Sequence, residues 1–166
     1  MMLTNAVVGI IQLLVAILFS VIALYIGFSV FGRITKGIDE EKEIAKGNAA
    51  IGILIASVFI AIGIVVQSGV AGISTGISTA LSVGLLTLNG MAAIAAAILQ
   101  LILGIAFAVI AIYIALNILD RLTKGIDEFA EIGKGNVAVA LEMAGVIIAV
   151  AVIIQSGVLG ITQALI

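Results

Sequence analysis

Apolar residues run almost without interruption through four long stretches of the chain, and two short polar segments divide these stretches into pairs. The apolar stretches cover residues 5–31, 48–68, 91–119 and 136–156. A helix rises about 1.5 Å per residue, so roughly 20 residues are enough to cross a hydrocarbon core of about 30 Å. The pattern therefore predicts four transmembrane helices.

Each stretch is apolar on every face that a helix would present, which leaves no side for water. The composition agrees, with 64% hydrophobic and 10% charged residues and a mean hydropathy of +1.46. A soluble helical bundle is the alternative, but a soluble fold of this size cannot bury so much apolar surface. We therefore expect an all-α integral membrane protein whose first partner is the lipid bilayer.

The two halves of the chain are duplicates of each other. Residues 11–74 match residues 99–162 at 32 of 64 positions without a gap. The match is densest in the polar segments, where both copies read R-x-T-K-G-I-D-E-x-x-E-I-x-K-G-N. We therefore expect two tandem, parallel two-helix hairpins, with the first repeat at residues 1–74 and the second at 91–166.

The connector between the repeats, residues 75–90, has a pattern of its own. Around it, apolar side chains recur at helical spacing, and hydroxyl side chains occupy the other side: Ile73, Ile77, Leu81, Leu85 and Leu88 against Ser74, Thr75, Ser78, Thr79 and Ser82. This pattern favours an amphipathic helix lying in the membrane interface. The alternative is a glycine-broken extension of the second helix that packs on its neighbours.

The basic residues indicate the orientation in the membrane, because all seven lie in the two polar segments. Cytoplasmic loops carry an excess of Lys and Arg, so loops 32–47 and 120–135 are expected in the cytoplasm and both termini outside. A fifth span within the connector would place the second loop on the opposite side. The connector is therefore expected not to cross the membrane.

Each polar loop has the residues of a short, well-capped helix. Asp39 is a suitable N-cap, Gly47 follows the last turn, and Asn48 can cap the next membrane helix. Asp127, Gly135 and Asn136 repeat this arrangement. One interpretation is a pair of solvated turns. The other is a docking surface for a cytoplasmic protein or for anionic lipid headgroups.

The loop motif, followed by an alanine-rich apolar helix, resembles the domain-of-unknown-function family 350, the YjfL-like membrane proteins of prokaryotes. The resemblance covers both copies and implies a multi-pass protein of a prokaryotic cytoplasmic (inner) membrane, without implying a reaction, substrate or cofactor. Asp120 departs from the first copy, which has Gly32 there. The signature positions implied by the resemblance are Thr35, Asp39, Glu43, Gly47 and Asn48, with Thr123, Asp127, Glu131, Gly135 and Asn136.

Four glutamines interrupt the apolar stretches at matching places: Gln12, Gln67, Gln100 and Gln155. Counting residues outward from the loops puts all four near the outer end of the bundle, so we expect one polar layer in which Gln12 faces Gln67. Interhelical amide hydrogen bonds in lipid contribute about 0.6–2 kcal/mol each, enough to fix helix register. The alternative is a pore constriction lined by amides.

Glu142 is the only acidic residue well inside a predicted span, and its counterpart in the first copy is Leu54. Tyr113 is expected at nearly the same depth, where its hydroxyl would donate a hydrogen bond to the carboxyl. The counterpart Tyr25 has no acid opposite. Glu142 is either a neutral or snorkelling carboxyl near the interface or part of an ion path.

The chain contains no Cys and no His, so it has few side chains suited to catalysis. Disulfides, thiolate nucleophiles and imidazole acid–base chemistry are excluded, and we expect neither an enzyme nor a bound cofactor. A net charge of −2 gives no basis for binding nucleic acid. Nineteen glycines and no proline favour smooth helices that associate closely. The leading hypothesis is a structural or membrane-organising homo-oligomer. The alternative is an ion or proton channel or transporter that uses Glu142 and the glutamine layer.

Overall fold

The computed structural model of the chain describes residues 2–34, 38–123 and 125–165, in which two pairs of long helices each enclose a short one. The prediction of an all-α fold with four membrane-spanning helices is confirmed, because four of the helices are long and apolar enough to cross a membrane. The described residues contain no strand. The helices are α1 (Met2–Ile34), α2 (Glu40–Ala45), α3 (Ala49–Val83), α4 (Leu88–Leu122), α5 (Glu128–Gly133) and α6 (Val137–Leu165).

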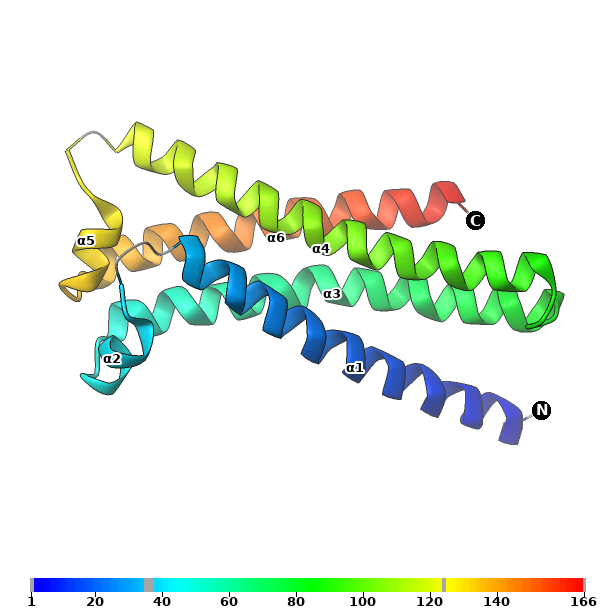
Figure 1. The fold of residues 1–166 in the computed structure, drawn as a ribbon. Helices are drawn as coiled ribbons and strands as arrows, with labels where there is room; N and C mark the ends of the chain where they lie inside the picture. The colour runs from blue at the N-terminus through cyan, green and yellow to red at the C-terminus, as the bar shows by residue number, and fades with distance from the viewer. Residues whose placement is uncertain (1, 35–37, 124, 166) are drawn as a thin grey trace.

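The two repeats point the same way, as Figure 1 shows. The short helices α2 and α5 lie at one end of the molecule, and the turn between α3 and α4 lies at the other end with both termini. Each repeat is thus a hairpin of two long helices closed by a loop with a short helix. This is the predicted tandem arrangement of parallel two-helix hairpins.

The connector does not form a separate helix, which corrects the prediction of an amphipathic interfacial helix over residues 75–90. Helix α3 continues without a break to Val83, and α4 begins at Leu88. The structure agrees with the alternative, in which the second helix extends and packs on its neighbours, except that the glycines do not break this helix. Each of these two helices has 35 residues, about 52 Å of helix.

The turn between α3 and α4 has a local cause. Gly84 has a φ of +96°, a conformation that side chains disfavour, and α3 ends there. The backbone N–H of Thr87 then donates to the carbonyl of Gly84 at 3.0 Å, and the Thr87 hydroxyl accepts from the N–H of Gly90 at 3.1 Å. Thr87 thereby caps α4 and reverses the chain within four residues.

Helix α3 is the centre of the molecule and packs against α4, α6 and α1. Its buried residues enter the groove between α4 and α6, where they form the main core with Ala108, Leu116, Ala140, Met143, Ile147 and Ala151. Helix α1 packs mainly on α3, and most of its surface is exposed. The second repeat therefore holds a helix of the first in its groove.

Glycines bring α3 and α4 into close contact. Gly69 lies directly against the side chain of Leu101. A Cβ at Gly76 would lie 2.7 Å from the Cβ of Ala97 and 2.9 Å from the carbonyl oxygen of Ala93. Such approach of two backbones is how apolar helices gain packing energy in lipid.

Candidate functional site

The first polar loop forms the capped helix that the sequence predicts. The Asp39 carboxylate accepts a hydrogen bond from the backbone N–H of Lys42 at 3.1 Å, which makes Asp39 the N-cap of α2. The Lys42 ammonium lies 2.6 Å from the other oxygen of the same carboxylate. Gly47 has a φ of +79° and ends the turn.

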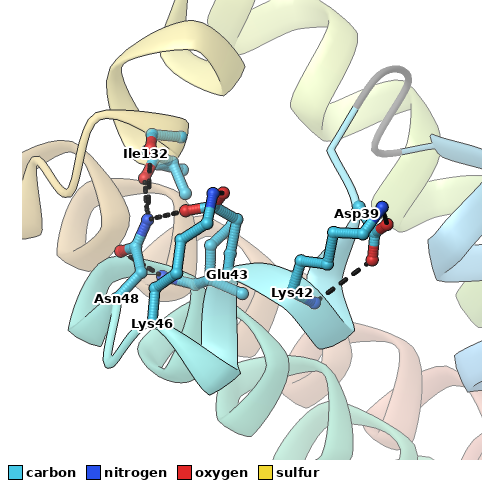
Figure 2. A network of polar contacts seen from close by, with 8 residues as sticks. Asp39, Lys42, Glu43, Lys46, Asn48 and Ile132 are labelled. Carbon is cyan, nitrogen blue, oxygen red and sulfur yellow. Dashed lines mark hydrogen bonds and ion pairs between the residues drawn. The ribbon is translucent and has the colours of Figure 1, made fainter.

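Asn48 links this loop to the next membrane helix, as Figure 2 shows. Its side-chain oxygen accepts from the backbone N–H groups of Ala50 and Ile51 at 3.0 and 3.3 Å, which confirms it as the cap of α3. Its amide nitrogen donates to the Glu43 carboxylate at 3.2 Å. Glu43 also pairs with the Lys46 ammonium at 2.6 Å.

The second loop repeats these contacts except the Lys42–Asp39 ion pair, because Ala130 stands in the position of Lys42. Asp127 accepts from the N–H of Ala130 at 2.9 Å, Glu131 pairs with Lys134 at 2.7 Å, and the Asn136 amide donates to Glu131 at 3.0 Å. Asn136 also accepts from two backbone N–H groups at the start of α6, and Gly135 has a φ of +89°. Most signature positions are therefore caps or their direct partners; Thr35 lies outside the described residues.

The two copies also differ in a contact between the repeats. The Asn48 amide also donates to the carbonyl oxygens of Ile132 and Gly133, at 3.1 and 3.2 Å, and so joins the first repeat to the end of α5 (Figure 2). Among the described residues, the side-chain amide of Asn136 donates only to Glu131 of its own copy. Within the described ranges, this bond between the repeats is thus made by the first copy alone.

Two acidic side chains of the loops, Glu43 and Glu131, are stabilised in their charged forms. Hydrogen bonds from Lys46 and then Asn48 lower the pKa of Glu43, and bonds from Asn136 and then Lys134 lower the pKa of Glu131. A carboxyl with a lowered pKa stabilises the fold above its unfolded pKa, and this contribution is lost as the pH falls through the lowered value. This contribution of Glu43 and Glu131 is therefore present at neutral pH and is lost in acid.

Glu128, which the sequence pattern did not single out as a site residue, is buried, with an exposure of 2%. The Thr123 hydroxyl hydrogen-bonds this carboxylate, so a signature threonine serves to fix the entry of α5. In both copies the threonine precedes this glutamate by five residues, and the repeated spacing is the feature of the sequence that points to this contact.

The four glutamines do not form the single layer expected from counting residues. Gln12 donates to the carbonyl of Ser74 at 3.4 Å, two turns of α3 beyond Gln67, which is exposed. Gln100 is buried and donates to the carbonyl of Val158 on α6 at 3.3 Å. Gln155 is half-buried. Counting assumes parallel helices, whereas α1 runs obliquely across α3 in Figure 1.

Glu142 and Tyr113 are not brought together by a hydrogen bond in the described part of the chain. Both side chains are exposed on the outside of the single chain, Tyr113 to 51%. Leu54, the counterpart of Glu142, has an exposure of 0%. The duplicated position is thus buried in α3 and open in α6.

The two large hollows are lined mainly by apolar side chains. A hollow of about 380 Å³ lies among α1, α3 and α4, and a groove of about 720 Å³ runs between α1 and α3. The groove contains Gln67 and Ser20 as its polar residues. Within the described ranges, no group of three acidic residues could hold a metal ion.

Comparison with known proteins gives one result. The family model described as Domain of Unknown Function (DUF350) matches residues 2–105 and, separately, residues 91–166. The two matches agree with two tandem copies of one unit. No curated protein and no solved structure matches the chain.

Proposed function

The chain belongs to the DUF350 family, and from that premise we propose that it is a structural or membrane-organising protein that acts as a homo-oligomer. The family description assigns no activity, so the proposal depends on the geometry of this chain. It concerns assembly within the membrane rather than chemistry on a substrate.

The observation that carries the proposal is the use of intramembrane amides as clamps between helices. Gln12 and Gln100 both donate to backbone carbonyls of neighbouring helices, which fixes register and leaves these amides engaged in the bundle. Helix α6 in addition exposes Gly145, Gly157 and Gly160, and a Cβ at any of them would meet no atom within 4 Å. A smooth, open helix face of this kind suits close packing with another helix.

The alternative is an ion or proton channel or transporter. It is favoured by one observation, the carboxyl of Glu142 within a helix that has no basic residue in its described apolar span. Acidic groups at such positions often serve ion paths. The glutamine layer that would complete the path is not formed, because Gln12, Gln67 and Gln100 lie in different surroundings.

A single reconstitution separates these two functions. We expect wild type in lipid to have the mass of a regular oligomer, to show no pH-dependent ion flux, and to be unchanged in both respects by Glu142→Gln, which preserves shape and hydrogen bonding. Native mass spectrometry and liposome flux assays measure the two properties. A strictly monomeric particle would overturn the proposal. A flux in wild type that disappears in Glu142→Gln would establish the alternative.

The same proposal places the protein in a prokaryotic cytoplasmic membrane with both loops in the cytoplasm, where they can bind a protein or anionic lipid headgroups. We expect Lys36 and Lys124 to react with an impermeant amine reagent only when it is admitted to the cytoplasm, because positive residues are retained there. A Cys replacing Ser78, at the opposite end, should react with an impermeant maleimide from outside. Labelling of either lysine in intact cells contradicts this orientation.

A further inference from the structure

The duplicated helices α3 and α6 bury different faces. Among the residues that α3 buries are six that matter here: Ala50, Leu54, Ser57, Ala61, Gly69 and Gly72. Their six counterparts on α6 are all exposed: Ala138, Glu142, Gly145, Ala149, Gly157 and Gly160. Equivalent sequence positions thus form a covered contact face in the first repeat and an open face in the second.

The partner surface shows the opposite difference. Residues of α4 and α6 that face the first repeat are buried: Ala97, Leu101, Ala140, Ala144, Ile147 and Ala151. Their counterparts on α1 and α3 are all exposed: Gly9, Leu13, Gly52, Ala56, Phe59 and Gly63. The chain therefore carries one completed contact between repeats and two open halves of the same contact.

The open half on the first repeat includes a groove between α1 and α3. In the second repeat, the groove between α4 and α6 is filled by α3; Val65 approaches Gly104 there and is 2% exposed. The equivalent groove between α1 and α3 is the hollow of about 720 Å³, which contains Ala16, the counterpart of Gly104. Ile153, the counterpart of Val65, is 70% exposed on α6.

The loops repeat this asymmetry at the end of the bundle. Asn48 donates across the repeat boundary to the carbonyls of Ile132 and Gly133. The described hydrogen bonds of the Asn136 amide remain within its own copy. The carbonyls equivalent to those of Ile132 and Gly133 belong to Ile44 and Ala45, at the exposed end of α2.

We propose that a second copy of the chain binds head to tail, with α6 of one copy in the α1–α3 groove of the next, as α3 lies in the α4–α6 groove within each chain. This inference rests on the proposed homo-oligomer and names its contact surfaces. The contact joins two different surfaces, so it is heterologous and extends to a ring or a filament. It places Gly157 against Leu13 of the next copy, and Asn136 against the carbonyls of Ile44 and Ala45.

A second copy is favoured over lipid as the occupant by continuity with the internal contact. Apart from Glu142, both open surfaces carry small or apolar residues as the completed one does, including Leu13 for Leu101, and Gly157 and Gly160 for Gly69 and Gly72. The side-chain amide of Gln100 lies against Gly72, so that a Cβ at Gly72 would be 3.1–3.3 Å from the amide atoms. Gln12 is the duplicate of Gln100, and on the neighbouring copy it would lie in the same relation to Gly160.

Cysteine cross-linking tests the contact without background, because the chain has no Cys. A Cβ at Gly69 lies 3.3 Å from the Cβ of Leu101, near the separation in disulfides, so Gly69→Cys with Leu101→Cys is the intrachain reference. We expect co-expressed Leu13→Cys and Gly157→Cys chains to form cross-linked dimers in native membranes on mild oxidation. Neither variant alone should do so, and the doubly substituted chain should give a ladder of multimers.

Leu14→Cys is the matched control, because Leu14 and Leu13 are exposed to 61% and 60% on adjacent faces of α1. Its cross-linking to Gly157→Cys should be several-fold lower. Dimers from either single variant alone would indicate a self-complementary contact and overturn the inference. A regular oligomer that does not form the Leu13–Gly157 cross-link would overturn the head-to-tail contact and leave the proposed function standing. A monomeric wild type would overturn both.

Discussion

Replacing Gly76 with leucine is expected to force α3 and α4 apart and to lower the free energy of unfolding by about 3 kcal/mol or more. The contacts of a Cβ at this position include the backbone carbonyl of Ala93, which cannot move aside as a flexible side chain would. The larger side chain therefore needs a shift of a whole helix. Denaturant titration of the protein dispersed as single copies in detergent measures the loss.

Gly63→Leu is the matched control on the same helix. A Cβ at Gly63 meets nothing within 4 Å. This variant of the dispersed chain should therefore unfold at the same denaturant concentration as wild type or at a slightly higher one, since leucine favours a helix over glycine. The head-to-tail contact predicts a separate effect in lipid, where the same leucine would obstruct the groove. Equal stability of Gly76→Leu and Gly63→Leu would contradict the close packing of α3 on α4.

Asn48→Ala is expected to lower the free energy of unfolding of the dispersed chain by about 2–4 kcal/mol, because one substitution removes a helix cap and two bonds between the repeats. The cap to Ala50 and Ile51 and the bonds to the α5 carbonyls all depend on this side chain. Hydrogen exchange should show the loss at the start of α3 and the end of α5 together.

Asn136→Ala provides the comparison within the same molecule. It removes the equivalent cap of α6 and the bond to Glu131, but no described bond between the repeats, so its cost should be about 1–2 kcal/mol. An equal loss for both variants in single copies would show that the bonds across the repeat boundary add nothing. In the assembled protein, Asn136→Ala should also weaken association.

The parts of this fold that are decided locally could be predicted from the sequence. Asp39 and Asn48 act on backbone groups within three residues, so their roles follow from residue type and spacing. The four spans follow from apolar length alone. Because the loop is duplicated, the sequence predicts the same two caps in the second copy, and the structure has them at Asp127 and Asn136.

The parts that depend on distant packing could not be predicted in this way. A hydroxyl face beside an apolar one suggested an interfacial helix, but residues 75–83 continue α3, which packs against α4 and ends only at Gly84. The depth of Gln12 depends on how obliquely α1 crosses α3. That α3 and α6 bury different faces had one sign in the duplicated sequence, Glu142 in the place of Leu54, because the difference arises from which neighbour each helix has.

The length of the hairpin formed by α3 and α4 has a consequence for the lipids around it. Two helices of about 52 Å are far longer than an average hydrocarbon core of about 30 Å. Such an excess is relieved by tilting, by a locally thicker bilayer, or by turns that stand in the headgroups. The last turns of α3 carry Ser78, Thr79 and Ser82, whose hydroxyls are compatible with a position among the headgroups. Because α3 is packed against α1, α4 and α6, any tilt must be shared by the whole chain, which makes its inclination sensitive to membrane thickness.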